Sequence, residues 1–130
     1  MGTAGATMLY SRTTSNLLYG CIDLFPSVAA DYISNTVTDS RGHFLLSRTA
    51  SNLSKAYKNG SILGTKTNIG NRTTKQITIS ASNKDNPDQL SQYSTRQWSF
   101  ASIGDGLTDT EATNFNTRLN TLMTYFGINV

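Results

Sequence analysis

The segment from Gln97 to Phe126 constrains the fold of this 130-residue chain more than any other stretch. It opens with alternating side chains over residues 97–103, with Trp98 and Phe100 on one face, and this period of two predicts a β-strand. Gly104 and Gly106 follow, and glycine tolerates the positive φ that a sharp turn needs. The sequence therefore predicts a strand that ends in a turn.

A helix is predicted directly after this turn, over about residues 108–126. Thr108 and Glu111 have the spacing of a capping box, in which each side chain accepts a hydrogen bond from the other residue's backbone amide. Gly127 occupies the place of a left-handed C-cap. Apolar residues recur at steps of three and four and form one stripe: Ala112, Phe115, Leu119, Leu122, Met123 and Phe126. The pattern indicates a single amphipathic helix packed against a sheet.

The chain before this segment reads as short strands separated by turns. After a flexible arm at residues 1–7, we expect strands at residues 8–12, 17–25, 43–48, 53–58, 61–66 and 75–81. Asn59-Gly60 is the strongest hairpin signal, because a two-residue type I′ turn needs positive φ at both positions. Residues 27–38 are compatible with a helical turn or an edge strand. Strands at this spacing predict one antiparallel sandwich domain over residues 8–130.

Charge and cysteine content exclude several classes of protein. Charged residues make up 15% of the chain, and the basic residues are scattered from Arg12 to Arg118 without a run, which argues against a nucleic-acid partner. Cys21 is the only cysteine, so no intrachain disulfide forms, and we expect a buried thiol. We expect no signal peptide and no membrane insertion, because residues 1–7 lack an apolar run and no stretch is long enough to span a bilayer.

Several segments carry a resemblance to a known family. They are the hairpin at residues 56–63, the strand at 76–83, the strand-to-helix junction at 100–111, and the shorter motifs at 10–12, 39–42 and 47–52. The first three resemble the concanavalin A-like lectin/glucanase, or laminin-G-like, jelly-roll superfamily. The whole set is similar to the variant seen in phage and environmental bacterial structural or fibre proteins. This resemblance covers most of residues 8–130 and implies an all-β, antiparallel jelly-roll-like sandwich with one C-terminal helix.

The resemblance also implies a function. We expect a non-enzymatic phage virion surface protein, a capsid decoration or fibre component, which docks on the particle and contacts surface glycans weakly. Such a protein is made in the host cytoplasm and carried to the virion surface. The alternative is a free-standing carbohydrate-binding module, and a glycoside hydrolase is a distant third. The family's domain usually has further strands ahead of the point where this chain begins, so an open sheet edge is expected to pair in a homo-oligomer or with other virion proteins.

Catalytic chemistry has little support in the residues. Glycoside hydrolysis needs paired carboxylates, but the only glutamate, Glu111, is accounted for by the capping box. The aspartates follow no alternating strand pattern. His43 is the only histidine and lies beside Phe44, where a partly buried strand residue is expected. We therefore assign no catalytic residue and expect no cofactor.

The sequence contains more candidates for binding sugars and cations than for catalysis. Sugar sites combine an aromatic ring for stacking with amide groups for hydrogen bonds, and the candidates are Tyr57, Asn59, Tyr93, Trp98 and Asn83. The competing interpretation places Trp98 in the core and Tyr57 and Tyr93 on an ordinary strand surface. Calcium candidates are Asp85, Asp88 and Asp105, although the full spacing of oxygen ligands is missing and a turn with an N-cap explains Asp105 better.

Overall fold

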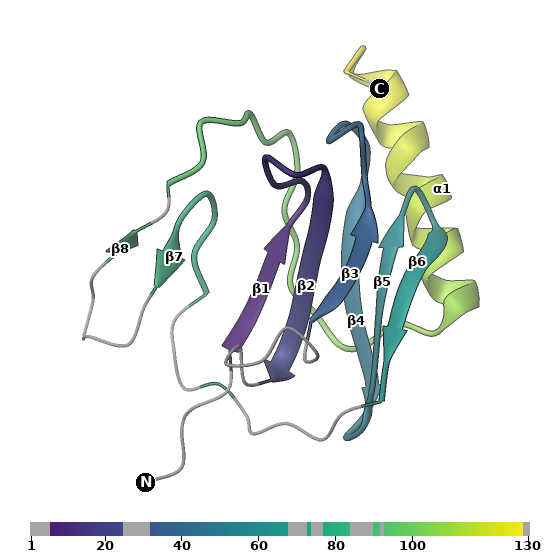
Figure 1. Cartoon of the computed structure of the whole chain (residues 1–130). Helices are drawn as coiled ribbons and strands as arrows, with labels where there is room; N and C mark the ends of the chain where they lie inside the picture. The colour runs from purple at the N-terminus through teal and green to yellow at the C-terminus, as the bar shows by residue number, and fades with distance from the viewer. Residues whose placement is uncertain are drawn as a thin grey trace, which may run out of the picture.

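The computed structural model describes residues 6–24, 32–67, 73, 77–83, 90–91 and 93–128. Its described part is mostly β, with two antiparallel three-stranded sheets and a single C-terminal helix (Figure 1). The expected all-β sandwich with one terminal helix is therefore confirmed. Of the expected flexible arm at residues 1–7, residues 1–5 lie outside the described residues, and residues 6 and 7 belong to the first strand, which corrects the end of the arm.

The two sheets are built from consecutive strands. The first sheet has the order β1 (Ala6–Tyr10), β2 (Leu17–Leu24) and β3 (Ile33–Thr36), and the second has β4 (Phe44–Ala50), β5 (Leu53–Lys58) and β6 (Ser61–Lys66). A short ribbon pairs β7 (Ser82–Asn83) with β8 (Leu90–Ser91), and the helix α1 spans Asp109–Tyr125. Within the ambiguous residues 27–38, β3 shows that the edge-strand interpretation holds for residues 33–36.

Turn and cap chemistry follows the sequence prediction at the Asn59-Gly60 turn and at both ends of the helix, whereas Gly104 and Gly106 do not adopt the positive φ expected of them. Asn59 and Gly60 have φ values of 51° and 79°, and Lys58 pairs with Ser61 across this turn, as a type I′ hairpin requires. The capping box of Thr108 and Glu111 is present. At the other helix end, Gly127 has a φ of 69°. Its amide and that of Ile128 donate to Thr124 and Met123, which is a Schellman motif.

The core lies between the two sheets. Leu18, Ile33, Val37 and Ala56 are buried there, and partly buried apolar side chains surround them: Leu9, Phe44, Leu46 and Leu63. Two glycines bring the sheets close together. A Cβ atom on Gly20 would lie 2.6 Å from Leu46, and one on Gly64 would lie 2.6 Å from Ile33. Since each contact crosses from one sheet to the other, glycine sets the spacing of the sandwich here.

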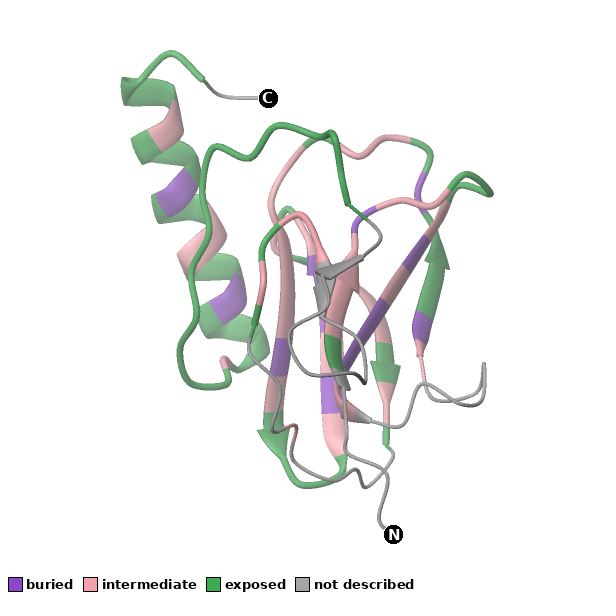
Figure 2. Cartoon of the chain, turned by 90° about the vertical axis from the view of Figure 1, so that its left-hand side faces the viewer, coloured by how far each residue is buried: buried purple, intermediate pink, exposed green. Residues whose placement is uncertain are grey.

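The helix lies against the opposite face of the second sheet, and β5 is therefore covered on both sides. Ala56 faces the core cluster, whereas its neighbour Tyr57 bonds to Asp109 at the start of α1. Both residues are buried, and Figure 2 shows buried bands along several strands of the sandwich. Strand β5 is thus the element that joins the sandwich to the helix.

Two predicted strands are wrong. Residues 77–81 form no strand, and Ile77 and Ile79 are exposed; residues 75–76 lie outside the described residues. Residues 97–103 also pair with no described strand, and Trp98 is 46% exposed, which corrects its assignment to the core. An alternating pattern favours extended backbone, but a ladder forms only where a neighbouring strand edge lies at the right distance.

The apolar stripe of α1 is only partly used. Ala112 and Leu119 are buried, whereas Leu122 and Phe126 are exposed. The last turns of the helix extend beyond the ends of the neighbouring strands (Figure 1). The amphipathic pattern was therefore correct for the helix as an element, but the sandwich buries the apolar stripe only as far as Leu119.

Candidate functional site

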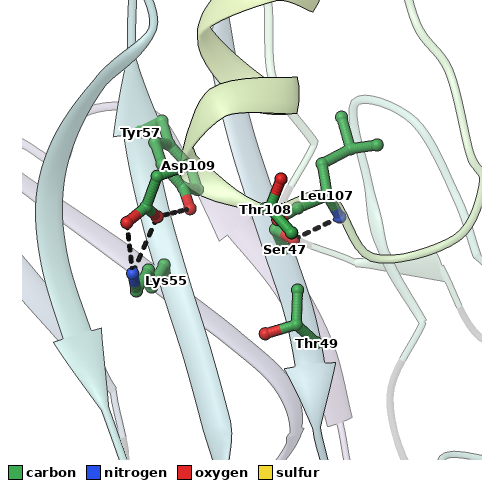
Figure 3. A pocket seen from close by; sticks show the side chains of 7 residues that line it. All are labelled: Ser47, Thr49, Lys55, Tyr57, Leu107, Thr108 and Asp109. Atoms are coloured by element: carbon green, nitrogen blue, oxygen red, sulfur yellow. Dashed lines mark hydrogen bonds and ion pairs between the residues drawn. The ribbon is translucent and has the colours of Figure 1, made fainter.

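A shallow hollow lies where the start of α1 meets β4 and β5 (Figure 3). Its volume is about 230 Å³. It is lined by a mostly polar set of side chains: Ser47, Thr49, Lys55, Tyr57, Leu107, Thr108 and Asp109. Strand alternation explains this set, because Ser47, Lys55 and Tyr57 occupy the face of the second sheet that points away from the core.

Ser47 fixes the chain just before the helix. Its Oγ accepts a hydrogen bond from the amide of Leu107 at 2.7 Å and donates to the carbonyl of the same residue at 2.6 Å. Gly106 lies beside the backbone of Arg48, so closely that a Cβ atom would come within 2.0 Å of the Arg48 carbonyl oxygen. The helix therefore starts at a position set by β4.

Asp109 connects the first turn of α1 to β5. The ammonium group of Lys55 lies 2.7 Å from both carboxylate oxygens, and the hydroxyl of Tyr57 donates to Oδ1 at 2.7 Å. The bonds from Lys55 and Tyr57 hold the pKa of Asp109 below its usual range. Burial, followed by the bond to Asp109, raises the pKa of Tyr57 well above its ordinary value. Neither group is therefore suited to exchange protons near neutral pH.

A second group of contacts holds the middle of α1 near the Asn59-Gly60 turn. The ring of His43 packs edge-on against Phe115, with the ring centres 5.3 Å apart, and its side chain bonds to Asn116. Burial lowers the pKa of His43, and the bond to Asn116 opposes this shift. Thr113 donates to the carbonyl of Gly60 at 3.2 Å. These contacts place His43 just before β4 as a partly buried residue, as expected from the sequence.

The arrangement of the hollow is that of a helix-docking site. Its polar side chains Ser47, Lys55 and Tyr57 bond to Leu107 or Asp109, and Thr108 bonds to Glu111. These hydrogen bonds and the ion pair are sufficient to hold the helix against the sheet. These contacts between the strands and the helix could not be predicted from the sequence, because Tyr57 and Asp109 are 52 positions apart.

The sugar candidates occupy two regions. Tyr57 is only 1% exposed, so its interpretation as a surface residue was wrong and its ring is not available for stacking. Asn59 accepts a bond from the amide of His43 at 2.8 Å. Tyr93 and Trp98 are exposed on the extended segment that leads to α1. Asn83 lies in β7, where it pairs with Leu90.

Only one of the cation candidates lies within the described residues. Asp105 is exposed in the turn before α1, and Asp85 and Asp88 lie outside the residues that the structure describes. Within the described ranges, no three side chains of His, Cys, Asp or Glu are placed to hold a metal ion.

A surface that the sequence analysis did not identify lies on residues 97–103 and the end of α1. Its exposed apolar side chains, here called the apolar strip, are Trp98, Phe100, Ile103, Leu122, Tyr125, Phe126 and Ile128. Phe100 lies near the helix, with its ring centre 6.1 Å from that of Phe115. Figure 2 colours this segment as exposed along its length. The signal in the sequence was the lack of any charged residue at positions 97–104 and 119–128.

Comparison of the chain with protein-family models, curated proteins and solved structures finds no match. Among the described residues, no helix has both the length and the apolar character needed to cross a membrane.

Proposed function

We propose that this chain is a non-enzymatic virion surface protein, a capsid decoration or fibre component, that acts by docking on other protein subunits. The observation that carries this proposal is the apolar strip, since a monomeric soluble protein rarely exposes several large apolar side chains together. The resemblance of residues 8–130 to structural and fibre proteins of phages supplies the virion setting.

The rest of the fold supports a role in presenting this surface. Ser47, Lys55 and Tyr57 fix the start of α1 to the second sheet. His43 and Gly60 hold its next turns. A helix fixed in this way presents its free end at a defined place, which reduces the entropy lost when a partner binds.

The test is association with particles. Particles from cells that produce the protein are washed in high salt and banded on a density gradient, and the chain is sought in the particle band by mass spectrometry. Salt resistance is expected because the strip carries no charge. An Ile103→Asp variant should be lost from the band, whereas Asn114→Asp should remain. Wild-type chain found only in the soluble fraction would contradict the proposal.

A carbohydrate-binding module is the second candidate, and exposed aromatic rings favour it. Tyr93 is 71% exposed and lies on the same extended segment as Trp98. A ring that is open on one face can stack against a sugar. A glycan array should then give a saturable signal that Tyr93→Ala and Trp98→Ala remove and Tyr125→Ala leaves in place. A blank array with the folded wild-type chain would remove this candidate.

A further inference from the structure

We propose that the apolar strip is covered by a second copy of this chain, in a two-fold symmetric dimer. The inference rests on the proposed function only in that both assign a docking role to the strip. In a two-fold contact each copy contributes the same surface, so one strip must be complementary to itself. Three features of the described residues meet that requirement.

The first feature is charge. The chain carries a net charge of +3, so two copies repel each other at long range. The residues of the strip lie in the two stretches 97–104 and 119–128, which carry no charged side chain. A copy that approaches through this surface therefore avoids placing like charges opposite one another. An acidic or basic partner would find no opposite charge to pair with there.

The second feature is area. Trp98, Phe100, Tyr125 and Phe126 are 46%, 38%, 84% and 60% exposed. An aromatic side chain buries 150–250 Å² when fully covered, so these rings offer roughly 450 Å² together. Ile103, Leu122 and Ile128 are also exposed and add to this area. Exposed apolar area of this size is a substantial part of the roughly 800 Å² that each partner contributes to a stable interface of standard size.

The third feature is the backbone of the segment before α1. Among the described residues, no hydrogen bond joins residues 97–106 to another part of the chain, although residues 97–103 alternate as a strand does. An unpaired strand is a template for another strand. Around a two-fold axis, the same segment of a second copy runs antiparallel to the first and supplies donors and acceptors in matching number.

Sedimentation velocity on the full chain from 1 to 200 μM tests the dimer. The wild type should show a concentration-dependent shift from the mass of one chain to twice that mass. Ile103→Asp and Tyr125→Asp should each raise the dissociation constant at least tenfold, because the two-fold axis brings the new charges of both copies into one interface. Both side chains are highly exposed, so each variant should keep the wild-type circular dichroism spectrum. Asn114→Asp makes the same change of charge on α1 outside the strip and should leave the dissociation constant unchanged.

Two results would overturn the dimer. One is a wild type that remains a single chain at 200 μM, and the other is a dimer that both strip variants leave intact. These results are separable from the test of the proposed function. A chain that bands with particles and stays monomeric in solution refutes the dimer alone, whereas a dimer absent from particles refutes the virion role alone.

Discussion

The hydroxyl of Tyr57 donates to Asp109 across 2.7 Å and so joins the central strand of the second sheet to the first turn of the only helix in the described chain. Tyr57 is buried on this face, and Ala56 is buried on the other. Ala56, which packs in the sandwich core, and Tyr57, which bonds to the helix, are therefore adjacent residues of one strand. A change at this junction should affect the whole fold and not the helix alone.

Removing the hydroxyl of Tyr57 tests this junction. Tyr57→Phe keeps the ring and deletes a hydrogen bond to a charged acceptor, so the free energy of unfolding should fall by about 1.5 kcal/mol. Urea denaturation at low protein concentration measures it. Tyr125→Phe makes the same change on a ring that is exposed and should leave the midpoint in place. Equal midpoints for wild type and Tyr57→Phe would show that the bond contributes nothing.

Two nearby glycines offer a matched pair of substitutions. A Cβ atom on Gly106 would lie 2.0 Å from the Arg48 carbonyl oxygen, whereas one on Gly104 meets nothing within 4 Å. Gly106→Ala should therefore push the segment away from β4 and lower the free energy of unfolding by about 1–3 kcal/mol. Gly104→Ala should be neutral or stabilise slightly, because it restricts the unfolded chain. Thermal unfolding of both variants measures these effects. Similar losses of stability in the two variants would contradict the close approach at Gly106.

Stability should depend on the protonation of His43. Its pKa is lowered from 6.5 in the folded chain, chiefly by burial, so the folded state favours the neutral ring. Stability is then fully present above pH 6.5 and falls as the pH drops through 6.5 toward the folded pKa. The pKa of Asp39, near 2, and the lowered pKa of Asp109 keep both carboxylates charged over this range. The melting temperature should fall between pH 7.5 and 5.5 in wild type and stay flat in His43→Gln; a parallel decline in both would assign the effect elsewhere.

The capping box should make a measurable contribution to α1. Thr108 accepts a bond from the amide of Glu111 at 3.3 Å, and its own amide donates to the Glu111 carboxylate at 2.9 Å. Thr108→Ala should lower the free energy of unfolding by about 1 kcal/mol, whereas Thr108→Ser keeps the hydroxyl and most of the stability. Helix content by circular dichroism and urea midpoints measure both variants. A serine variant as unstable as the alanine variant would exclude the hydroxyl as the cause.

Features that depend on a few consecutive residues were predictable from the sequence. The Asn59-Gly60 turn, the capping box at Thr108 and the left-handed Gly127 each depend on backbone geometry that neighbouring residues determine. Strands β5 and β6 were predicted with their observed bounds for the same reason, because the turn between them fixes the register.

Features that depend on distant partners were not predictable. The alternation at residues 97–103 indicates an extended backbone, but it does not reveal whether a strand edge lies beside it. The stripe on α1 indicates one apolar face, but not that the sandwich buries it only as far as Leu119. The burial of Tyr57 was missed because no residue near it in the sequence indicates that Asp109 accepts a bond from its hydroxyl. In each case the missing information is the position of a segment far along the chain.

The central claim is that the segment before α1, together with the helix end, is a surface for another chain. Amide hydrogen exchange over residues 97–105 tests it most directly, at 1 μM, where the chain is expected to be dissociated, and at 200 μM. The account predicts fast exchange at the low concentration and clear protection at the high one, with β5 protected in both. Equally fast exchange of residues 97–105 at both concentrations would contradict it.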